Sequence, residues 1–321
     1  MKMKINLLVS SACFFISAAS AADFPNKELT MVIPYPPGGI TDIVGRTVAE
    51  QMGQDLGQPV VVENRSGAGG SIGASYAARA KADGYTMFLG TSATHGTNPS
   101  TYKNLSYDPV LDFEPVSLLA SAPLVIITSN ALPVESLQEF IDYAKDRPGE
   151  LSYATTGTGG SVHLTTEEFA MLNDLDIVHV PYKGSSPALT DVVGKRIDVM
   201  FDNVPSATPF IKAGKVKALA VTSSDRSLLL PDVKTVAEST NPGFDSGSWI
   251  ALYAPKGTPD NVIQKLNESA NNALKRQSLI DIFTEAGLST QGGSTEDLQE
   301  HQQGEITKWA EVVEAIGYEP Q

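Results

Sequence analysis

The sequence contains little cysteine, little histidine and little positive charge. Its only cysteine, Cys13, lies within the first 22 residues, a segment that we expect to be removed. The four histidines show no metal-ligand spacing with cysteines or carboxylates; they are His95, His163, His179 and His301. We therefore expect a mature protein with no disulfide, no thiol chemistry, no metal ion and no cofactor.

Basic residues are outnumbered, since 23 lysines and arginines stand against 37 aspartates and glutamates. An acidic protein repels nucleic acids and anionic lipid surfaces, which argues against both as partners. No stretch after residue 22 is apolar enough to form a membrane-spanning helix. About 300 mature residues exceed the usual size of one hydrophobic core, so we expect two domains.

The N-terminus has the three parts of a secretory signal peptide. Met1–Lys4 carries two lysines, Ile5–Ser17 is apolar, and small residues follow at Ser20–Ala22. We expect cleavage after Ala21 or Ala22, so that residues 1–22 are lost. The mature chain then has 21 basic and 37 acidic residues, a net charge of −16. These features predict a soluble periplasmic protein.

Short β-branched runs alternate with helical patterns along most of the chain. The predicted strands are Leu29–Ile33, Pro59–Glu63, Thr86–Gly90, Leu124–Thr128, Leu151–Ala154, Ile177–Pro181, Ile197–Phe201, Val216–Thr222 and Trp249–Ala254. The predicted helices are Asp42–Leu56, Ser71–Ala80, Val134–Asp146, Val162–Leu172, Pro187–Gly194, Pro205–Ala213, Asp260–Lys275, Leu279–Ala286 and Thr295–Ile316. Repeated strand–helix–strand units predict an α/β fold with parallel sheets covered by helices on both faces.

Two glycine-rich segments each lie between a predicted strand and a predicted helix. In residues 32–42, three prolines and two glycines precede a helix that starts at Thr41 or Asp42; the second segment is Gly157–Ser161. Glycines leave the backbone accessible, and a helix N-terminus offers free N–H groups and the positive end of its dipole. Such segments bind anions. Two of them suggest a ligand held at both ends.

The runs Pro115–Thr128 and Ser248–Ala254 lack an adjacent helix and have alternating apolar character. We interpret them as the two crossings of a hinge. The first lobe then comprises residues 23–123 plus 250–321, and residues 124–249 form an inserted second lobe. Ligands of open α/β sheets bind beyond the carboxyl ends of the strands, which places the two glycine segments on opposite lips of one cleft.

The chain resembles the solute-binding proteins of tripartite tricarboxylate transporters, the Bug receptors. The matching stretches, in family order, are Pro34–Asp42, Val62–Gly70, Ala82–Thr86, Tyr107–Val116, Tyr153–Leu164, Asp198–Asn203, Gly214–Thr222 and Trp249–Pro259. The resemblance implies a type II periplasmic binding protein fold, in which two α/β lobes close on a small carboxylate. It also implies delivery of this ligand to membrane permease subunits. Ser66 departs from the family's usual proline, and Tyr35 replaces a frequent phenylalanine and could add a hydroxyl at the cleft.

Carboxylate binding needs N–H and hydroxyl donors that converge on the two oxygens. On the first lobe we expect them from the backbone of Gly38, Gly39 and Ile40 and from Thr41. Asp42 cannot bind an anion directly; by analogy with the family it holds the loop and orders water, or it simply complements the helix dipole. Ser92 and Thr94 follow the third strand and supply hydroxyls either to the ligand or to a solvated loop.

On the second lobe, the donor-rich loop comprises Thr155, Thr158, Gly159, Gly160 and Ser161. His163 lies on the first turn of the next helix and is either a ligand contact or a structural hydrogen-bonding residue. Tyr182 follows a strand and could stack on the ligand. Asn203 can donate and accept, whereas Asp202 would repel a carboxylate and instead accept from a ligand hydroxyl, an amine or an internal N–H.

Gly69–Gly73 matches the Gly-x-Ser-x-Gly elbow of serine hydrolases. That elbow requires a strand running straight into the serine, whereas Arg65–Gly70 intervenes here, so we expect Ser71 to start a helix instead. The favoured function is a monomeric transport receptor for a di- or tricarboxylate, aliphatic or aromatic, and not an enzyme. The alternatives are a periplasmic sensor that feeds a signalling partner and, least favoured, a secreted serine hydrolase.

Overall fold

The computed structural model describes residues 24–320, so the predicted signal peptide lies outside the described residues. The first half of the sheet contains β1 (Leu29–Ile33), β2 (Val60–Asn64) and β3 (Thr86–Thr91), which are parallel in the order β2-β1-β3. The helices between them are α1 (Ile40–Leu56) and α2 (Ser71–Ala78). Val44, Val48 and Met52 lie on one face of α1 and are fully buried against this sheet.

A short irregular segment follows β3. The π-helical turn η2 (Ala93–Thr97) leads directly into α3 (Asn98–Thr101), and neither was predicted. Residues 91–101 alternate small and polar side chains without an apolar period, which explains why the pattern gave no helix signal. Pro at the second position of α3 suits a helix start because its missing N–H would be unpaired there.

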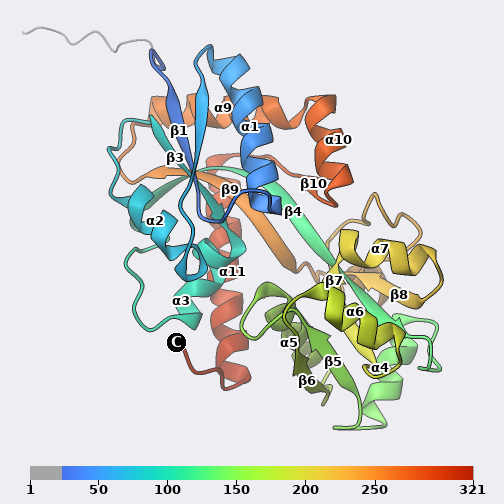
Figure 1. Cartoon of the computed structure of the whole chain (residues 1–321). Helices are drawn as coiled ribbons and strands as arrows, with labels where there is room; N and C mark the ends of the chain where they lie inside the picture. The colour runs from blue at the N-terminus through green and yellow to red at the C-terminus, as the bar shows by residue number, and fades with distance from the viewer. Residues whose placement is uncertain (1–23, 321) are drawn as a thin grey trace, which may run out of the picture.

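Two long strands join the halves of the molecule (Figure 1). β4 (Phe113–Ser129) has 17 residues and pairs with the antiparallel strand β9 (Gly247–Pro255), which also pairs with β3. Beyond Pro123, β4 continues into the second half and pairs with the antiparallel strands β7 (Val199–Asn203) and β8 (Val216–Val221). The predicted parallel pairing therefore holds within each half but not for β4 and β9, which are antiparallel to their neighbours. The chain enters the second half along β4 and returns along β9, so these neighbours must run in opposite directions.

The second half repeats the α/β pattern. Its strands are β5 (Ser152–Thr155), β6 (Val178–Pro181), β7 (Val199–Asn203) and β8 (Val216–Val221), and its helices are α4 (Leu137–Lys145), α5 (Ser161–Leu172), α6 (Ser185–Val193), α7 (Val204–Lys212) and α8 (Val236–Ser239). β6, β5 and β7 are parallel neighbours. Within residues 24–320, all strands belong to one curled ten-stranded sheet. Its helices cover both faces, as predicted.

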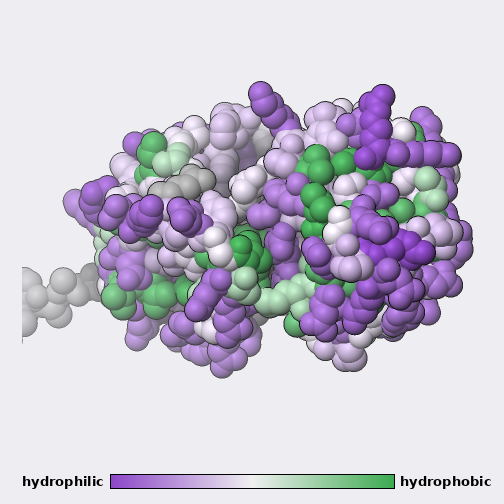
Figure 2. Space-filling view, turned by 90° about the horizontal axis from the view of Figure 1, so that it is seen from below, coloured by the Kyte–Doolittle hydropathy of each residue, from purple (hydrophilic) through white to green (hydrophobic). Residues whose placement is uncertain are grey.

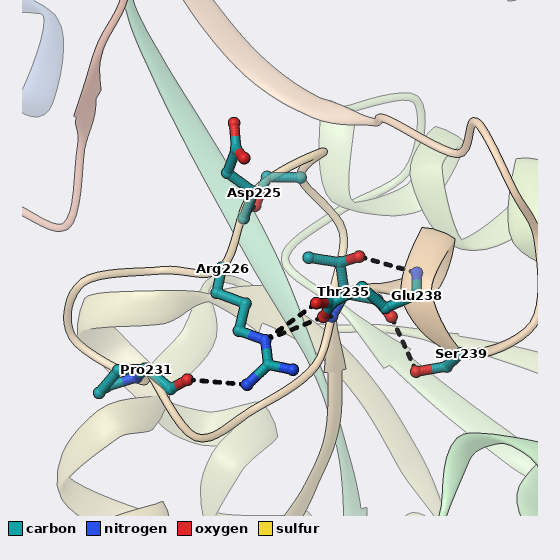
Figure 3. Close-up of polar contacts among 7 residues, drawn as sticks. Asp225, Arg226, Pro231, Thr235, Glu238 and Ser239 are labelled. Carbon is teal, nitrogen blue, oxygen red and sulfur yellow. Dashed lines mark hydrogen bonds and ion pairs between the residues drawn. The ribbon is translucent and has the colours of Figure 1, made fainter.

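Hydrogen bonds from side chains hold the loop between β8 and α8 in place (Figure 3). Arg226 Nε donates to both carboxylate oxygens of Glu238, at 2.9 and 3.2 Å, and its guanidinium also donates to Pro231 O at 3.2 Å. Thr235 and Glu238 form a reciprocal capping box at the start of α8. These contacts explain how a four-residue helix is stable at the surface.

The C-terminal residues return to the first half as α9 (Asp260–Leu274), α10 (Gln277–Glu285), β10 (Ser289–Thr290) and α11 (Thr295–Ala315). α11 packs on η2 and β4, and its last turns also pack on α5 of the second half. Leu164 of α5 shares a buried cluster with Trp309, Val312 and Val313 of α11. This helix therefore forms a third contact between the halves, beside β4 and β9. Within residues 24–320, no helix has both the length and the hydropathy to cross a membrane.

The clusters of buried apolar residues separate at the positions where the chain passes from one half to the other. Two clusters draw only on residues before Pro123 and after Ser248, and two others only on residues 124–244. Seen from below, the molecule forms two rounded masses that meet at a narrower waist, where apolar residues reach the surface (Figure 2). Each half has its own core, and the waist lies where β4 and β9 cross.

Candidate ligand-binding cavity

A cavity of about 400 Å³ lies at the waist, with walls from both halves. It is lined by Tyr35, Ile40, Thr41, Gly69, Thr91, Ser92, Ala93, Thr97, Asn98, Thr101, Tyr102, Ala122, Thr158, Gly159, Gly160, Ser161, Asn203, Ser248, Trp249, Ile250 and Tyr318. None of these lining residues, all of which belong to the described part of the chain, has a charged side chain. Hydroxyls, amides, backbone N–H groups and aromatic rings make up its polar and apolar walls.

The first glycine segment leads into α1, whose N-cap is Gly39. Ile40 and Thr41, the first residues of the helix, line the cavity, so free N–H groups of the first turn lie beside it. Gly38 adopts φ +90°, a left-handed conformation that favours glycine. Its N–H donates to Asp42 Oδ2 at 2.9 Å and is therefore already satisfied within the protein.

Asp42 is a buried anchor of this loop. Besides the Gly38 N–H, its carboxylate accepts from Arg46 Nε and from Asn64 Nδ2, each at 2.9 Å. The Arg46 bond, with those from Gly38 and Asn64, lowers the pKa of Asp42 to about 2 despite its burial. Asn64 also donates to Tyr35 O, so one network fixes both sides of the loop. Asp42 therefore fixes the loop and does not itself line the cavity.

The second glycine segment leads into α5 in the same way. Gly160 is its N-cap, and residues Thr158–Ser161 all line the cavity. The Gly159 N–H donates to His163 Nδ1 at 3.2 Å, just as the Gly38 N–H donates to the side chain four residues later. The two helix N-termini therefore face one cavity from opposite halves, each held by a glycine N–H bonded to the first turn.

His163 is a structural residue of the second loop. Because Nδ1 accepts from Gly159, the neutral ring carries its proton on Nε2, which lies 3.6 Å from Glu167 Oε1. The ring stacks on His179 at 4.1 Å between centroids, and burial lowers the pKa of both histidines, that of His179 to about 4. Thr155 Oγ1 contacts His179 Nε2 at 2.6 Å, so this hydroxyl also helps to fix the histidine pair that supports the loop.

Other predicted residues are divided between the cavity and the interior. Tyr35, Ser92 and Asn203 line the cavity. Tyr182 does not, because its hydroxyl donates to Asp191 Oδ2 at 2.8 Å. Asp202 is fully buried; Ser185 Oγ donates to its Oδ1 at 2.5 Å, and burial raises its pKa to about 6. The predicted residues outside the lining are thus Gly38, Gly39, Asp42, Thr94, Thr155, His163, Tyr182 and Asp202.

Several lining residues were missed by the sequence reasoning. Ala122, Ser248, Trp249 and Ile250 lie on the crossing strands, and their place in the predicted hinge could have suggested them. Thr97, Asn98, Thr101 and Tyr102 come from the unpredicted η2–α3 segment. Tyr318 lies at least 157 residues away from both glycine segments, and no local pattern indicates it.

Trp249 links the cavity wall to the contact between the halves. Its Nε1 donates to Glu305 Oε2 at 2.8 Å, and Trp309 Nε1 donates to the same oxygen at 2.9 Å. Lys308 pairs with Glu305 at 2.5 Å and lies 3.8 Å from Glu168 of α5. The fluorescence of both tryptophans in the chain is therefore sensitive to changes in this region.

Ser71 has no hydrolase geometry. It follows the 3₁₀ turn η1 (Ala68–Gly70) and starts α2, as predicted, so no strand runs directly into it. Its hydroxyl lies 3.5 Å from Asn98 Nδ2, an amide group that donates a hydrogen bond and cannot remove a proton.

Comparison with known proteins gives a consistent result. The family described as "Tripartite tricarboxylate transporter family receptor" (TctC) matches residues 44–318. Protein BugT of Bordetella pertussis is 37% identical over 98% of this chain and 99% of its own length.

Two solved structures are also similar. Rpa4515 of R. palustris with adipate is 38% identical, with a TM-score of 0.74, over 93% of this chain and 100% of that one. MatC (Rpa3494) from Rhodopseudomonas palustris with bound malate is 35% identical, with a TM-score of 0.69, over 90% and 100%. The expected type II periplasmic binding protein fold is thus confirmed, and the chain belongs to the tripartite tricarboxylate transporter receptor family, the TctC or Bug proteins.

Proposed function

We propose that this protein is a periplasmic solute-binding protein that captures a small di- or tricarboxylate and delivers it to the membrane subunits of a tripartite tricarboxylate-type transporter. The observation that carries the proposal is the pair of helix N-termini, α1 and α5, that face one cavity from opposite halves. The adipate and malate named for the two similar structures support a carboxylate ligand.

Neutral donors suit the capture and release of an anion. The N–H groups of Ile40, Thr41 and Ser161 and the hydroxyls of Thr41, Thr158 and Ser161 can bond carboxylate oxygens without burying a countercharge. A buried lysine or arginine would bind more strongly but would be left unpaired, at a high cost, whenever the ligand leaves. A receptor that must hand over its ligand therefore benefits from donors that water can also satisfy.

The ligand would also control the shape of the molecule. We assign residues 23–123 and 250–321 to one lobe and 124–249 to the other, with bending near Leu124 and Trp249. A ligand bonded to both lobes stabilises the closed state by its differential affinity for it. Closure would present a distinct surface to the membrane subunits, while the unliganded, open receptor would not.

Thermal unfolding of the mature protein with a panel of carboxylates tests this function. Adipate, malate, citrate, glutamate and terephthalate are the first probes, and a ligand that binds only the folded state raises Tm with its concentration. Titration followed by tryptophan fluorescence gives Kd, because Trp249 lines the cavity. We expect at least one dicarboxylate to bind. A panel in which no carboxylate raises Tm or alters the fluorescence would contradict the proposal.

A further inference from the structure

Tyr318 lies beyond α11 in a tail that folds back onto the helix end. Gly317 adopts φ +62°, its N–H donates to Glu314 O, and the Tyr318 N–H donates to Val313 O, each at 3.1 Å. The Tyr318 side chain packs against the cluster that joins α5 and α11. Its position is therefore fixed by the backbone turn and by contacts from both halves.

Tyr318 belongs to the lining of two hollows. One is the ligand cavity; the other is a surface hollow of about 440 Å³ between α5 and α11. The second hollow is lined by His163, Glu167, Ala170, Met171, Leu175, Ala315, Ile316 and Tyr318. Tyr318 is the residue that the two linings share. We therefore expect that removal of its side chain would join the two spaces.

Gly159 is shaped to accept this ring. A Cβ atom at Gly159 would lie 2.8 Å from the Tyr318 hydroxyl oxygen, closer than atoms pack, and its φ of +79° already favours glycine. The bare backbone at Gly159 thus accommodates the tyrosine, whereas Gly160 next to it has open space on its own Cβ side. The end of the cavity at α5 is bounded by a residue of the C-terminal tail.

The second hollow differs in chemistry from the cavity. Its walls combine apolar side chains, among them Met171, Leu175 and Ile316, with the polar groups of His163 and Glu167; burial keeps His163 neutral, and Glu167 is the acidic group of this lining. A second carboxylate placed there would be repelled by Glu167, whereas an uncharged alkyl chain would be accepted.

We propose that Tyr318 is a specificity-determining residue that excludes carboxylates carrying a long alkyl arm by closing the cavity toward this second hollow. The inference rests on the proposed function. It assigns to the C-terminal tail a part of the binding site that neither glycine segment supplies.

The test compares succinate and adipate with 2-octylsuccinate, which keeps two carboxylates and adds an uncharged alkyl arm. Calorimetry of the wild-type protein should show the short diacids bound more tightly than 2-octylsuccinate. Tyr318→Ala should shift this ratio toward 2-octylsuccinate by about tenfold or more, since several methylenes gain apolar contacts in the second hollow. Tyr318→Phe keeps the ring and should keep the wild-type ratio.

Tyr102→Ala is the matched control, because Tyr102 lines the ligand cavity but not the second hollow. It should weaken all three probes without favouring 2-octylsuccinate. Tyr318→Leu retains an apolar contact with α5 and serves as a second variant should the alanine variant unfold. An unchanged ratio in a folded alanine or leucine variant would overturn the role of Tyr318 alone. If wild type binds no short diacid, the proposed function fails, and this inference with it.

Discussion

At the residue scale, each helix N-terminus at the cavity is held by a side chain that accepts a hydrogen bond from a glycine N–H four positions earlier. Asp42 holds the Gly38 N–H and His163 holds the Gly159 N–H. Both side chains lie outside the cavity lining, yet both fix the loops that reach it. Tyrosines play a related part, since a Cβ at Gly69 would meet Tyr102 and one at Gly159 would meet Tyr318. Glycine here makes room for the protein's own rings as well as for a ligand.

Asp42→Asn should make stability less sensitive to acid. The folded-state pKa of Asp42 is lowered to about 2 from an ordinary 3.8, so its stabilisation is present above pH 3.8 and lost as pH falls toward 2. Its loss should cost at most about 2 kcal/mol at pH 7, since the partner Arg46 is half exposed. Urea unfolding from pH 7 to pH 2.5 measures this, with exposed Asp55→Asn as control. A difference from wild type that stays constant with pH would contradict the role assigned to Asp42.

Gly160→Val should abolish tight binding without harming the fold. Gly160 has extended backbone angles, φ −83° and ψ 171°, which valine adopts readily, and its Cβ direction is open. Because Gly160 lines the cavity, the added side chain would cover the α5 N-terminus, and we expect at least about a tenfold loss of affinity. Calorimetry with adipate, alongside Tm, measures both effects. Wild-type affinity in the folded variant would refute the α5 half of the site.

At the element scale, sequence reasoning located most strands and helices because their apolar periods are clear. α1, α4 and α5 differ from the predicted bounds by three residues or fewer at each end. Strand direction was not predictable from the pattern, because β4 and β9 look like any buried strands until their pairing is known. Likewise, the segment Thr91–Tyr102 supplies much of one cavity wall but has no period to reveal it. Tyr318 reaches the site only through the packing of α11 on α5.

Gly304→Ala should stabilise α11 without affecting the ligand. Gly304 is exposed in the middle of the helix, and an added Cβ meets no atom within 4 Å. Alanine has less conformational freedom to lose, so we expect the free energy of unfolding to rise by about 0.5–1 kcal/mol. Chemical unfolding measures the gain, and an unchanged Kd for adipate is the control. A destabilised variant would show that α11 is strained or contacted at this position.

At the scale of the whole molecule, each half has its own core, and β4, β9 and α11 connect them. The Glu305–Trp249–Trp309 cluster lies at this connection, next to the cavity. A ligand that bonds to Thr41 on one side and to Ser161 on the other can therefore act directly on the angle between the halves.

Small-angle scattering tests this coupling. Ligand should reduce the radius of gyration of the wild type, with bending near Leu124 and Trp249. The double variant Thr158→Val with Ser161→Ala removes two hydroxyls at the α5 end and should bind less tightly and close less fully at saturating adipate. Full closure of the double variant would mean that other residues, such as Asn203, draw the second lobe inward.

The most direct test of a ligand held at both ends is calorimetry with adipate and its half-amide, which differ only in the charge of one terminus. If both helix N-termini bind carboxylates, adipate should bind about ten- to a hundredfold more tightly, since a charge-assisted hydrogen bond contributes about 1.5–3 kcal/mol. Equal affinities for the two compounds would contradict the two-ended site.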